Sequence, residues 1–427
     1  MKILAKVAFF TSKKDIFVFF GLIFVLLIFS LSYEYYKYRQ LTKFDSQLVE
    51  ATVIKEYEKT KLTKKGKLKH YKVLKLNSDD GLSFYTIAPK KSTTLQNKHL
   101  QLEIWAGKIS FTEYLKNFFV FSKILRIDNI PTLKQTLITK IENQHPDNDI
   151  AKLYQALFLA LPLPKYMQTQ FSNLGISHLI AISGFHLGVL SAVLFFLIKY
   201  PYKFLQNRYF PYRSYKRDTF IIITVTLFAY LLFLNAPPSL VRAFTMLVVG
   251  FVLYDRGIEI ISMQTLLLSV LIILALFPKL LFSIGFWLSV SGVFYIFLFL
   301  IYFKEQNKLI QFILLPFWVY LMMLPFSMSI FGNFSLIHPL SILWTTLFSL
   351  FYPLSIVLHV TGFGGFFDMP LHYLMTLDTH PLQQILATKY LIVEIILSLA
   401  AIFSKKALSF LITYLLLLFI YFIYNVT

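Results

Sequence analysis

The sequence predicts a polytopic bundle of membrane-spanning α-helices with a small β-domain after the first span. Of 427 residues, 57% are hydrophobic and 15% are charged, whereas soluble domains carry about 25% charged residues. Several windows of about 18 or more residues lack any charge, which is long enough for a helix to cross a bilayer. One polar stretch, from Tyr33 to about Gly107, interrupts this pattern near the N-terminus. The fold class is therefore an all-α membrane bundle with one β-domain.

The first span follows a basic N-terminus. After the lysines of residues 1–14 and Asp15, an apolar run extends from Ile16 to Leu31. A basic flank before a hydrophobic span places the N-terminus in the cytoplasm. A cleaved signal peptide is the alternative, but the run is long for one and no small-residue cleavage site follows it. We therefore expect residues 1–33 to form the cytoplasmic N-terminus and the first membrane anchor.

Residues 34–110 are expected to form an extracytoplasmic β-domain. Apolar and polar residues alternate in LVEATVIKEY, LKHYKVLKL, LSFYTI and HLQLEIW, and turn-forming residues separate these runs. The pattern predicts a small antiparallel barrel or sandwich. Between Glu34 and Asp149 there are 21 Lys and Arg against 13 Asp and Glu. This excess suits a polyanion or an anionic membrane surface, and a solvated face with anchoring charges explains it equally well.

Residues 111–176 are expected to form amphipathic helices that lie on the membrane surface or pack on the bundle, because the stretch is too polar and too broken by prolines to span. Residues 177–427 then form the transmembrane domain. With the first span they give about ten crossings of bilayer length. The apolar segments are 177–199, 219–236, 238–254, 263–280, 283–303, 309–330, 335–360, 388–403 and 407–424.

Basic loops orient these spans. The loop from Lys199 to Asp218 is strongly basic, and counting spans from an inside N-terminus also places it in the cytoplasm. Lys405 and Lys406 fall outside if every segment crosses once. Either one segment is re-entrant or the rule for basic loops fails there, and the stretch that contains Pro339 and Pro353 is the candidate for a broken or re-entrant pair of helices.

The segment GISHLIAISGFHLGVL, from Gly175 to Leu190, places polar groups at membrane depth. Such groups usually face an interior or a water-filled path. His178 and His186 lie about 80° apart on an ideal helix, with Ser183 close to that side. The alternative is that each histidine simply hydrogen-bonds a neighbouring helix, and two histidines without a further ligand do not make a zinc site.

Glycines and prolines mark close packing or interruptions in the same region. Gly184 and Gly188 form a G-x-x-x-G pair, which permits either the close approach of another helix or an opened backbone. Further on, NAPPSLVRAF begins at Asn235, where two prolines must interrupt a helix and Ser239 can cap the next one. Arg242 has no acidic neighbour in sequence until residue 255, so its guanidinium needs a carbonyl, a carboxylate or a phosphate as partner.

These segments, in this order, resemble the ComEC competence family. The first is similar to the family's SHLLAISGLHVGLL and the second to its P-S-x-x-R-A turn. A third, FSIGFWLSVSG from Phe282, resembles the family's G-F-Q-L-S-F segment, but Trp287 replaces the glutamine and so receives no substrate contact. A weaker fourth match spans residues 324–340, and together the matches cover about residues 155–345.

The resemblance implies a channel in the bacterial inner membrane that passes single-stranded DNA into the cytoplasm during natural transformation. It also implies an OB-like β-domain after the first span, a periplasmic DNA receptor, a cytosolic DNA motor or single-strand-binding proteins, and contact with membrane lipids. The residues expected along the DNA pathway are His178, Ser183, Gly184, His186, Gly188, Asn235, Ser239 and Arg242.

A basic hairpin in the β-domain is a second candidate DNA contact. Its lysines and aromatic rings can attract phosphates and stack on bases, although the lysines can equally protect an edge strand from aggregation. The residues are Lys64, Lys65, Lys67, Lys69 and Tyr71.

No catalytic motif is present in the sequence. It lacks the H-x-H-x-D-H cluster found in the C-terminal metallo-β-lactamase-like domain of many longer ComEC relatives, and it has no H-E-x-x-H, Walker or G-x-S-x-G motif. With no cysteine, thiolate metal sites and disulfides are excluded. We expect a channel without a cofactor rather than an enzyme. The alternatives are a transporter of a lipid or other anionic small molecule, and an intramembrane hydrolase that uses Ser183 with His178 or His186.

Overall fold

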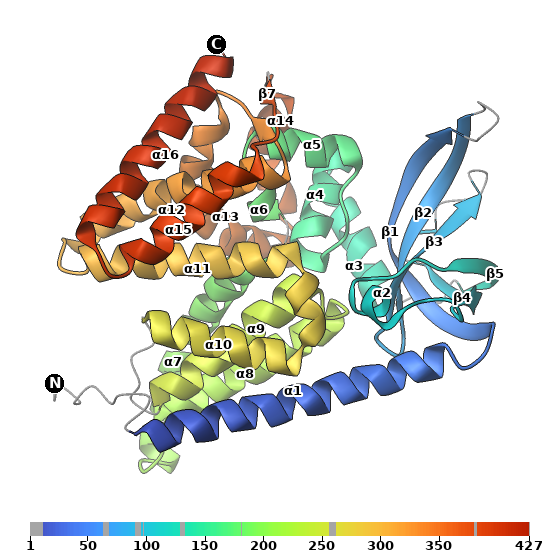
Figure 1. Cartoon of the computed structure of the whole chain (residues 1–427), viewed down its shortest axis with the longest axis horizontal. Coiled ribbons are helices and arrows are strands. Elements are labelled where there is room, and N and C mark those ends of the chain that lie inside the picture. Colours follow the sequence, from blue (N-terminus) through green and yellow to red (C-terminus); the bar gives the residue numbers. More distant parts are fainter. Residues whose placement is uncertain are drawn as a thin grey trace.

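The computed structural model describes residues 12–62, 68–89, 95–96, 98–128, 133–180, 182–255, 262–379 and 382–426. In these residues a β-domain stands beside a large helical bundle, and the long helix α1 runs along the bundle to reach the β-domain (Figure 1). The prediction of a mainly helical protein with a small N-terminal sheet is confirmed.

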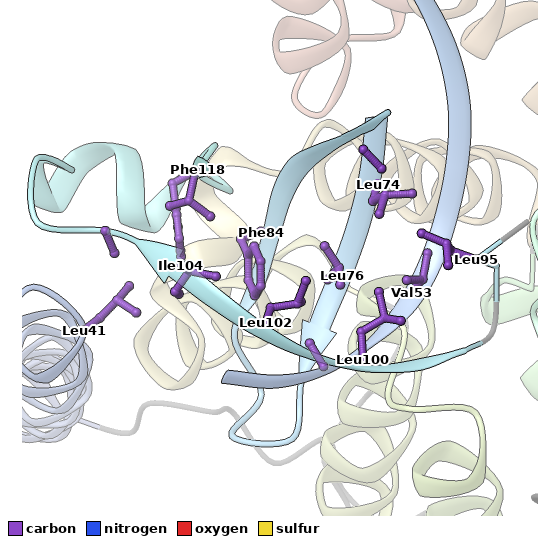
Figure 2. Packing of buried hydrophobic residues seen from close by; sticks show 14 of the residues in the cluster. Leu41, Val53, Leu74, Leu76, Phe84, Leu95, Leu100, Leu102, Ile104 and Phe118 are labelled. Carbon is purple, nitrogen blue, oxygen red and sulfur yellow. The ribbon is translucent and has the colours of Figure 1, made fainter. Parts of the chain in front are cut away.

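Helix α1 (Lys13–Leu41) connects the two parts. Its first turn is fixed by a capping box, in which Ser12 Oγ accepts from the Asp15 amide at 3.2 Å and the Asp15 carboxylate accepts from the Ser12 amide at 2.9 Å. The helix extends ten residues beyond the end of the apolar run at Leu31, and so beyond the expected end of the anchor at residue 33. Leu41 packs into the core of the β-domain (Figure 2).

The β-domain is a five-stranded antiparallel sheet with the strand order β3-β2-β1-β4-β5. At its edges, the Tyr85 amide donates to the Phe118 carbonyl and the Val120 amide donates to the Tyr85 carbonyl, both at 2.9 Å. These bonds join the β3 edge to the segment just before β5, so the sheet closes on itself. The strands are β1 (Gln47–Leu62), β2 (Leu68–Ser78), β3 (Ser83–Pro89), β4 (His99–Trp105) and β5 (Phe121–Asp128).

Alternate apolar side chains fill this closed sheet. In β4, Leu100, Leu102 and Ile104 are buried while the residues between them are half-buried, as the period of two predicts. Burial of each such side chain contributes about 1.5–3 kcal/mol. Phe84 and Phe118 stack in the same core, with ring centroids 6.0 Å apart (Figure 2).

Residues 111–176 are only partly helical, which corrects the prediction for this segment. Residues 121–128 form β5, because the backbone groups along the free edge of β4 need hydrogen-bond partners and this segment supplies them. The β-domain therefore extends beyond the expected boundary at residue 110. The helices of the segment are α2 (Phe111–Leu115), α3 (Leu133–Glu142), α4 (Asn148–Leu159) and α5 (Lys165–Asn173).

The bundle contains six helices that are long and apolar enough to cross a membrane, counted over the described residues: α1, α7, α11, α12, α13 with the turn before it, and α16. Helices α8, α9, α10 and α15 have 14 to 19 residues. The helices are α6 (Ser177–Ile180), α7 (Gly184–Tyr209), α8 (Tyr215–Phe233), α9 (Pro238–Asp255), α10 (Met263–Leu276), α11 (Ile284–Phe303), α12 (Lys308–Ile330), α13 (Ser341–Thr361), α14 (Asp368–Thr376), α15 (Thr388–Ala401) and α16 (Lys405–Val426).

Short elements join these helices. In the stretch where we expected a broken or re-entrant pair, helix α13 continues through Pro353, because an α-helix tolerates the loss of one backbone donor when its neighbours hold it. Pro339 lies in the turn that precedes α13. The short elements are η1 (Pro278–Phe282), η2 (His338–Leu340), η3 (Gly364–Phe367), β6 (Asn333–Phe334) and β7 (Leu382–Gln383).

A partly buried histidine network fixes the α3–α4 link to the end of α13. His145 Nδ1 lies 2.8 Å from Asp368 Oδ1, His145 Nε2 lies 2.9 Å from His359 Nε2, and His359 Nδ1 lies 2.7 Å from the Ser355 carbonyl.

We expect His145→Ala to destabilise the full chain by about 1–3 kcal/mol, because the substitution leaves buried polar groups without partners. The matched control is His372→Ala. His372 pairs with Asp147 at 3.1 Å in the same joint, but its side chain is 62% exposed, and exposed pairs contribute about 0–1 kcal/mol. Thermal unfolding of the detergent-solubilised chain measures the difference, and equal effects of both changes would contradict this account.

Candidate nucleic-acid interface

A cavity of about 2040 Å³ lies between the β-domain and the helical bundle. Strands β1 and β2 form one wall, and α3, α4 and the chain leading into α5 form another. The turn between α8 and α9 and the start of α11 also line it. The cavity therefore joins the β-domain to two of the segments that carry the family resemblance.

The described lining of this cavity is strongly basic, with nine lysines against three glutamates. Some of the lysines are paired: Lys72 with Glu56 at 2.6 Å, Lys152 with Asp149 at 3.0 Å, and Lys279 with Glu34 at 2.8 Å. The positive excess remains after these pairs. The lysines are Lys55, Lys59, Lys72, Lys75, Lys98, Lys134, Lys152, Lys165 and Lys279.

Lys55 and Lys75 lie directly opposite each other in the β1–β2 ladder. Like charges in this position destabilise a sheet. Burial lowers the pKa of both lysines, and the charge of Lys55 lowers the pKa of Lys75 further. Burial also lowers the pKa of Lys134 in α3. The wall therefore holds positive charge at a cost in stability, which a bound anion would reduce.

Tyrosines accompany these lysines. The Nζ atoms of Lys55 and Lys59 lie 5.9 Å and 5.7 Å from the centroid of the Tyr57 ring, and Lys75 Nζ lies 5.7 Å from that of Tyr85. Cations next to aromatic faces are the combination that binds single strands, because phosphates meet the charges and bases stack on the rings.

The polar segment of residues 175–190 is a broken helix. Helix α6 ends at Ile180, and Ser183 caps α7 by accepting from the Phe185 amide at 3.3 Å. His186 Nδ1 accepts from the Ser183 amide at 3.2 Å. The expectation that His178 and His186 lie on one side of a single helix is therefore wrong, because Ser183 bonds the backbone amides that a continuous helix would use.

Gly184 permits a close approach between α7 and α9. A Cβ atom on Gly184 would lie 3.3 Å from the Ala243 Cβ, and Ser239 Oγ donates to the Ile182 carbonyl at 2.8 Å. A Cβ atom on Gly188 would have no atom of the described residues within 4 Å. Of the two glycines, only Gly184 therefore makes the predicted close packing.

Arg242 lies where α9 meets the start of α11. Its Nη1 atom is 3.6 Å from the position that a Cβ on Gly285 would take, and the residue is only 6% exposed. Its Nε atom is buried without a hydrogen-bond partner. Among the described residues we find neither the carbonyl nor the carboxylate partner that the sequence led us to expect.

The chain before α9 turns sharply, and this turn lines the cavity. Asn235 and Ala236 have φ angles of 60° and 47°, a left-handed conformation that is uncommon for residues other than glycine. The predicted interruption by Pro237 and Pro238 is confirmed, because α8 ends at Phe233 and α9 begins at residue 238.

The fourth segment completes the cluster. The ring of His338 lies 2.9 Å from the place of a Cβ on Gly175, whose φ of 72° already favours glycine. His178 Nε2 lies 3.2 Å from Thr345 Oγ1 in α13, and the His186 ring packs edge-on against Phe348 and Tyr352. His186 is buried and bonded to its own helix cap, which favours the structural interpretation for this residue.

A family model described as competence protein matches residues 162–426. The chain belongs to the competence protein family. The match includes all four contacting segments and begins after the β-domain, and membership indicates a role in DNA uptake for natural transformation. No curated protein and no solved structure gives a significant match.

The basic hairpin lies largely outside the described residues, which exclude Lys64, Lys65 and Lys67. The backbone of Lys69 pairs in β2, and Tyr71 pairs with Lys59 and Pro89. The sequence did not single out Lys55 or Lys59. The period-two alternation of Lys55, Tyr57 and Lys59 along β1 was the available signal, since it places all three on one face.

We expect the double substitution Lys55→Gln with Lys75→Gln to weaken single-stranded DNA binding by the full chain. Each lost phosphate contact should lower the slope of log affinity against log salt by about 0.7. The matched control is Lys108→Gln with Lys123→Gln, which removes two exposed lysines of the β-domain that do not line the cavity. Fluorescence anisotropy across a salt series measures the effect, and equal slopes for the two double variants would contradict the cavity assignment.

Proposed function

We propose that this chain forms the channel through which single-stranded DNA enters the cytoplasm during natural transformation. The observation that carries the proposal is the lysine-rich cavity, whose lining includes the turn before α9 and the N-terminal cap of α11. A strand with one negative charge per nucleotide cannot cross hydrocarbon, so it needs a hydrated route with cationic groups. Membership of the competence protein family gives the proposal its biological context.

We assign the β-domain to the OB-like class. Strands β1 to β3 form an antiparallel meander. Strand β4 pairs with the other side of β1, and β5 pairs with β4. A parallel bridge between Tyr85 and Phe119 then links β3 to the chain before β5. OB-folds bind oligonucleotides on the face of their second and third strands. Lys75 in β2 and Tyr85 in β3 lie opposite each other in this part of the sheet.

We place the chain in the inner membrane with its N-terminus in the cytoplasm and the β-domain on the periplasmic side. The basic flank of α1 and the basic residues at the end of α7 and the start of α8 support this orientation. The shorter helices α8, α9, α10 and α15 complete about ten crossings. Local thinning of the bilayer can accommodate spans shorter than about 20 residues.

A periplasmic receptor would deliver DNA to the cavity, and a cytosolic motor or single-strand-binding proteins would draw it inward. We propose no catalytic role for the chain. The contact between Ser183 Oγ and His186 Nδ1, at 3.2 Å, belongs to the cap of α7, which supports a structural role for this pair rather than a nucleophile and its base.

We expect Arg242→Ala to abolish transformation while membrane insertion and DNA uptake into the periplasm remain intact, because the change removes a cation beside the proposed route. The control is Arg208→Ala, at an exposed position near the end of α7. Acquisition of a chromosomal marker is scored together with labelled DNA in periplasm and cytoplasm. Transformation at the parental rate by the Arg242 variant would reject a pathway role for this residue, and unimpaired transformation by a deletion strain would reject the function itself.

A further inference from the structure

We propose that Arg242 and the first turn of α11 form a binding site for a single phosphate group. The inference rests on the proposed function, since the phosphate belongs to the backbone of the passing strand. The site is defined by the Arg242 guanidinium, the Ser283 cap and the amides of Ile284 and Gly285.

Three helices begin around this point. The start of α7 contacts α9 through Gly184 and Ala243, and the start of α11 contacts α9 through Gly285 and Arg242. Arg242 itself lies only four residues after the first residue of α9. Each helix N-terminus carries roughly half a positive charge. The positively charged guanidinium therefore lies close to helix N-termini that are also positive.

Such an arrangement is unfavourable without an anion. A buried cation is costly unless it is paired and hydrogen-bonded. Arg242 is only 6% exposed. No described residue offers its guanidinium a hydrogen bond or an ion pair. The partner that would compensate this charge must therefore come from outside the described chain.

The start of α11 offers donors to the same partner. Ser283 Oγ accepts from the Phe286 amide at 3.2 Å, while the amides of Ile284 and Gly285 lie in the first turn, where a helix provides no internal acceptor. Anions bind well to such helix starts. Because Gly285 has no side chain, it leaves Nη1 of Arg242 uncovered.

The chemistry favours phosphate. A guanidinium presents a planar set of donors that matches phosphate oxygens in a bidentate manner. Ser283, Leu280 and Lys279 line the cavity, so an anion held at the start of α11 is next to the space in which we place the strand. A phospholipid headgroup presents the same group, and the experiment has to separate these two sources.

The test uses the full chain in detergent and compares two substitutions with one control. Arg242→Gln removes the charge. Gly285→Ala adds a methyl group 3.6 Å from Nη1 and 3.8 Å from Ser283 Oγ, which is ordinary contact that the fold tolerates but which covers the guanidinium. The control is Gly292→Ala on the same helix, where no described atom lies within 4 Å of the added methyl group.

The probes are a phosphodiester oligothymidylate, the same oligomer with a neutral methylphosphonate backbone, and short-chain phosphatidylglycerol against phosphatidylcholine. We expect Arg242→Gln and Gly285→Ala to weaken binding of the phosphodiester oligomer by roughly 10- to 100-fold, as for a lost charged hydrogen bond. Gly292→Ala should bind like the parent, and the neutral oligomer should bind all four proteins equally.

Two results would overturn the inference. Parental affinity of both Arg242→Gln and Gly285→Ala for the phosphodiester oligomer would reject the phosphate site. A loss confined to phosphatidylglycerol would reject the strand as its occupant and assign the site to a lipid. If either result were found while Arg242→Ala still abolished transformation, the inference about the phosphate site would be rejected. The proposed channel function would nevertheless stand.

Discussion

The burial of a guanidinium that has no partner among the described residues is the constraint around which three helix starts of this bundle are arranged. Arg242 is held by α9 against the start of α11, in a bundle whose longest described helices are apolar enough to cross a membrane. Hydrocarbon offers no compensating partner, and burying charge there is costly. The turn at Asn235, the close contact at Gly184 and the bare backbone at Gly285 all help to place three helix starts around this one cation.

The basic cavity extends the same principle into the β-domain. Opposed lysines on β1 and β2 oppose folding, and the closed sheet offsets this cost by burying a continuous apolar core on its inner side. The strand edges are joined through Tyr85, so the charged wall belongs to a rigid element rather than to a loop. Strain of this kind persists at functional sites because the surrounding structure supports it.

Local pattern predicted much of the fold, and long-range contacts account for what it missed. Alternation in β1 to β4 and the prolines before α9 identified their elements correctly. Residues 121–128 resemble an amphipathic segment in isolation, and only the free edge of β4 makes them a strand. The break before α7 depends on one capping serine. The cavity could not be predicted, because Lys55, Lys134 and Lys279 lie far apart in sequence and meet only through tertiary packing.

The two cationic regions act over different ranges. The cavity lysines border open solvent, where charges separated by more than about 8 Å are screened at physiological salt. In the proposed channel they would attract a strand and align it without holding any one phosphate firmly. Arg242 is buried, so its interaction is screened little but extends only to direct contact. In the channel that we propose, a strand would be gathered by many weak charges and would then meet one strong, geometrically defined partner. This order suits transport, because binding must favour entry without preventing release.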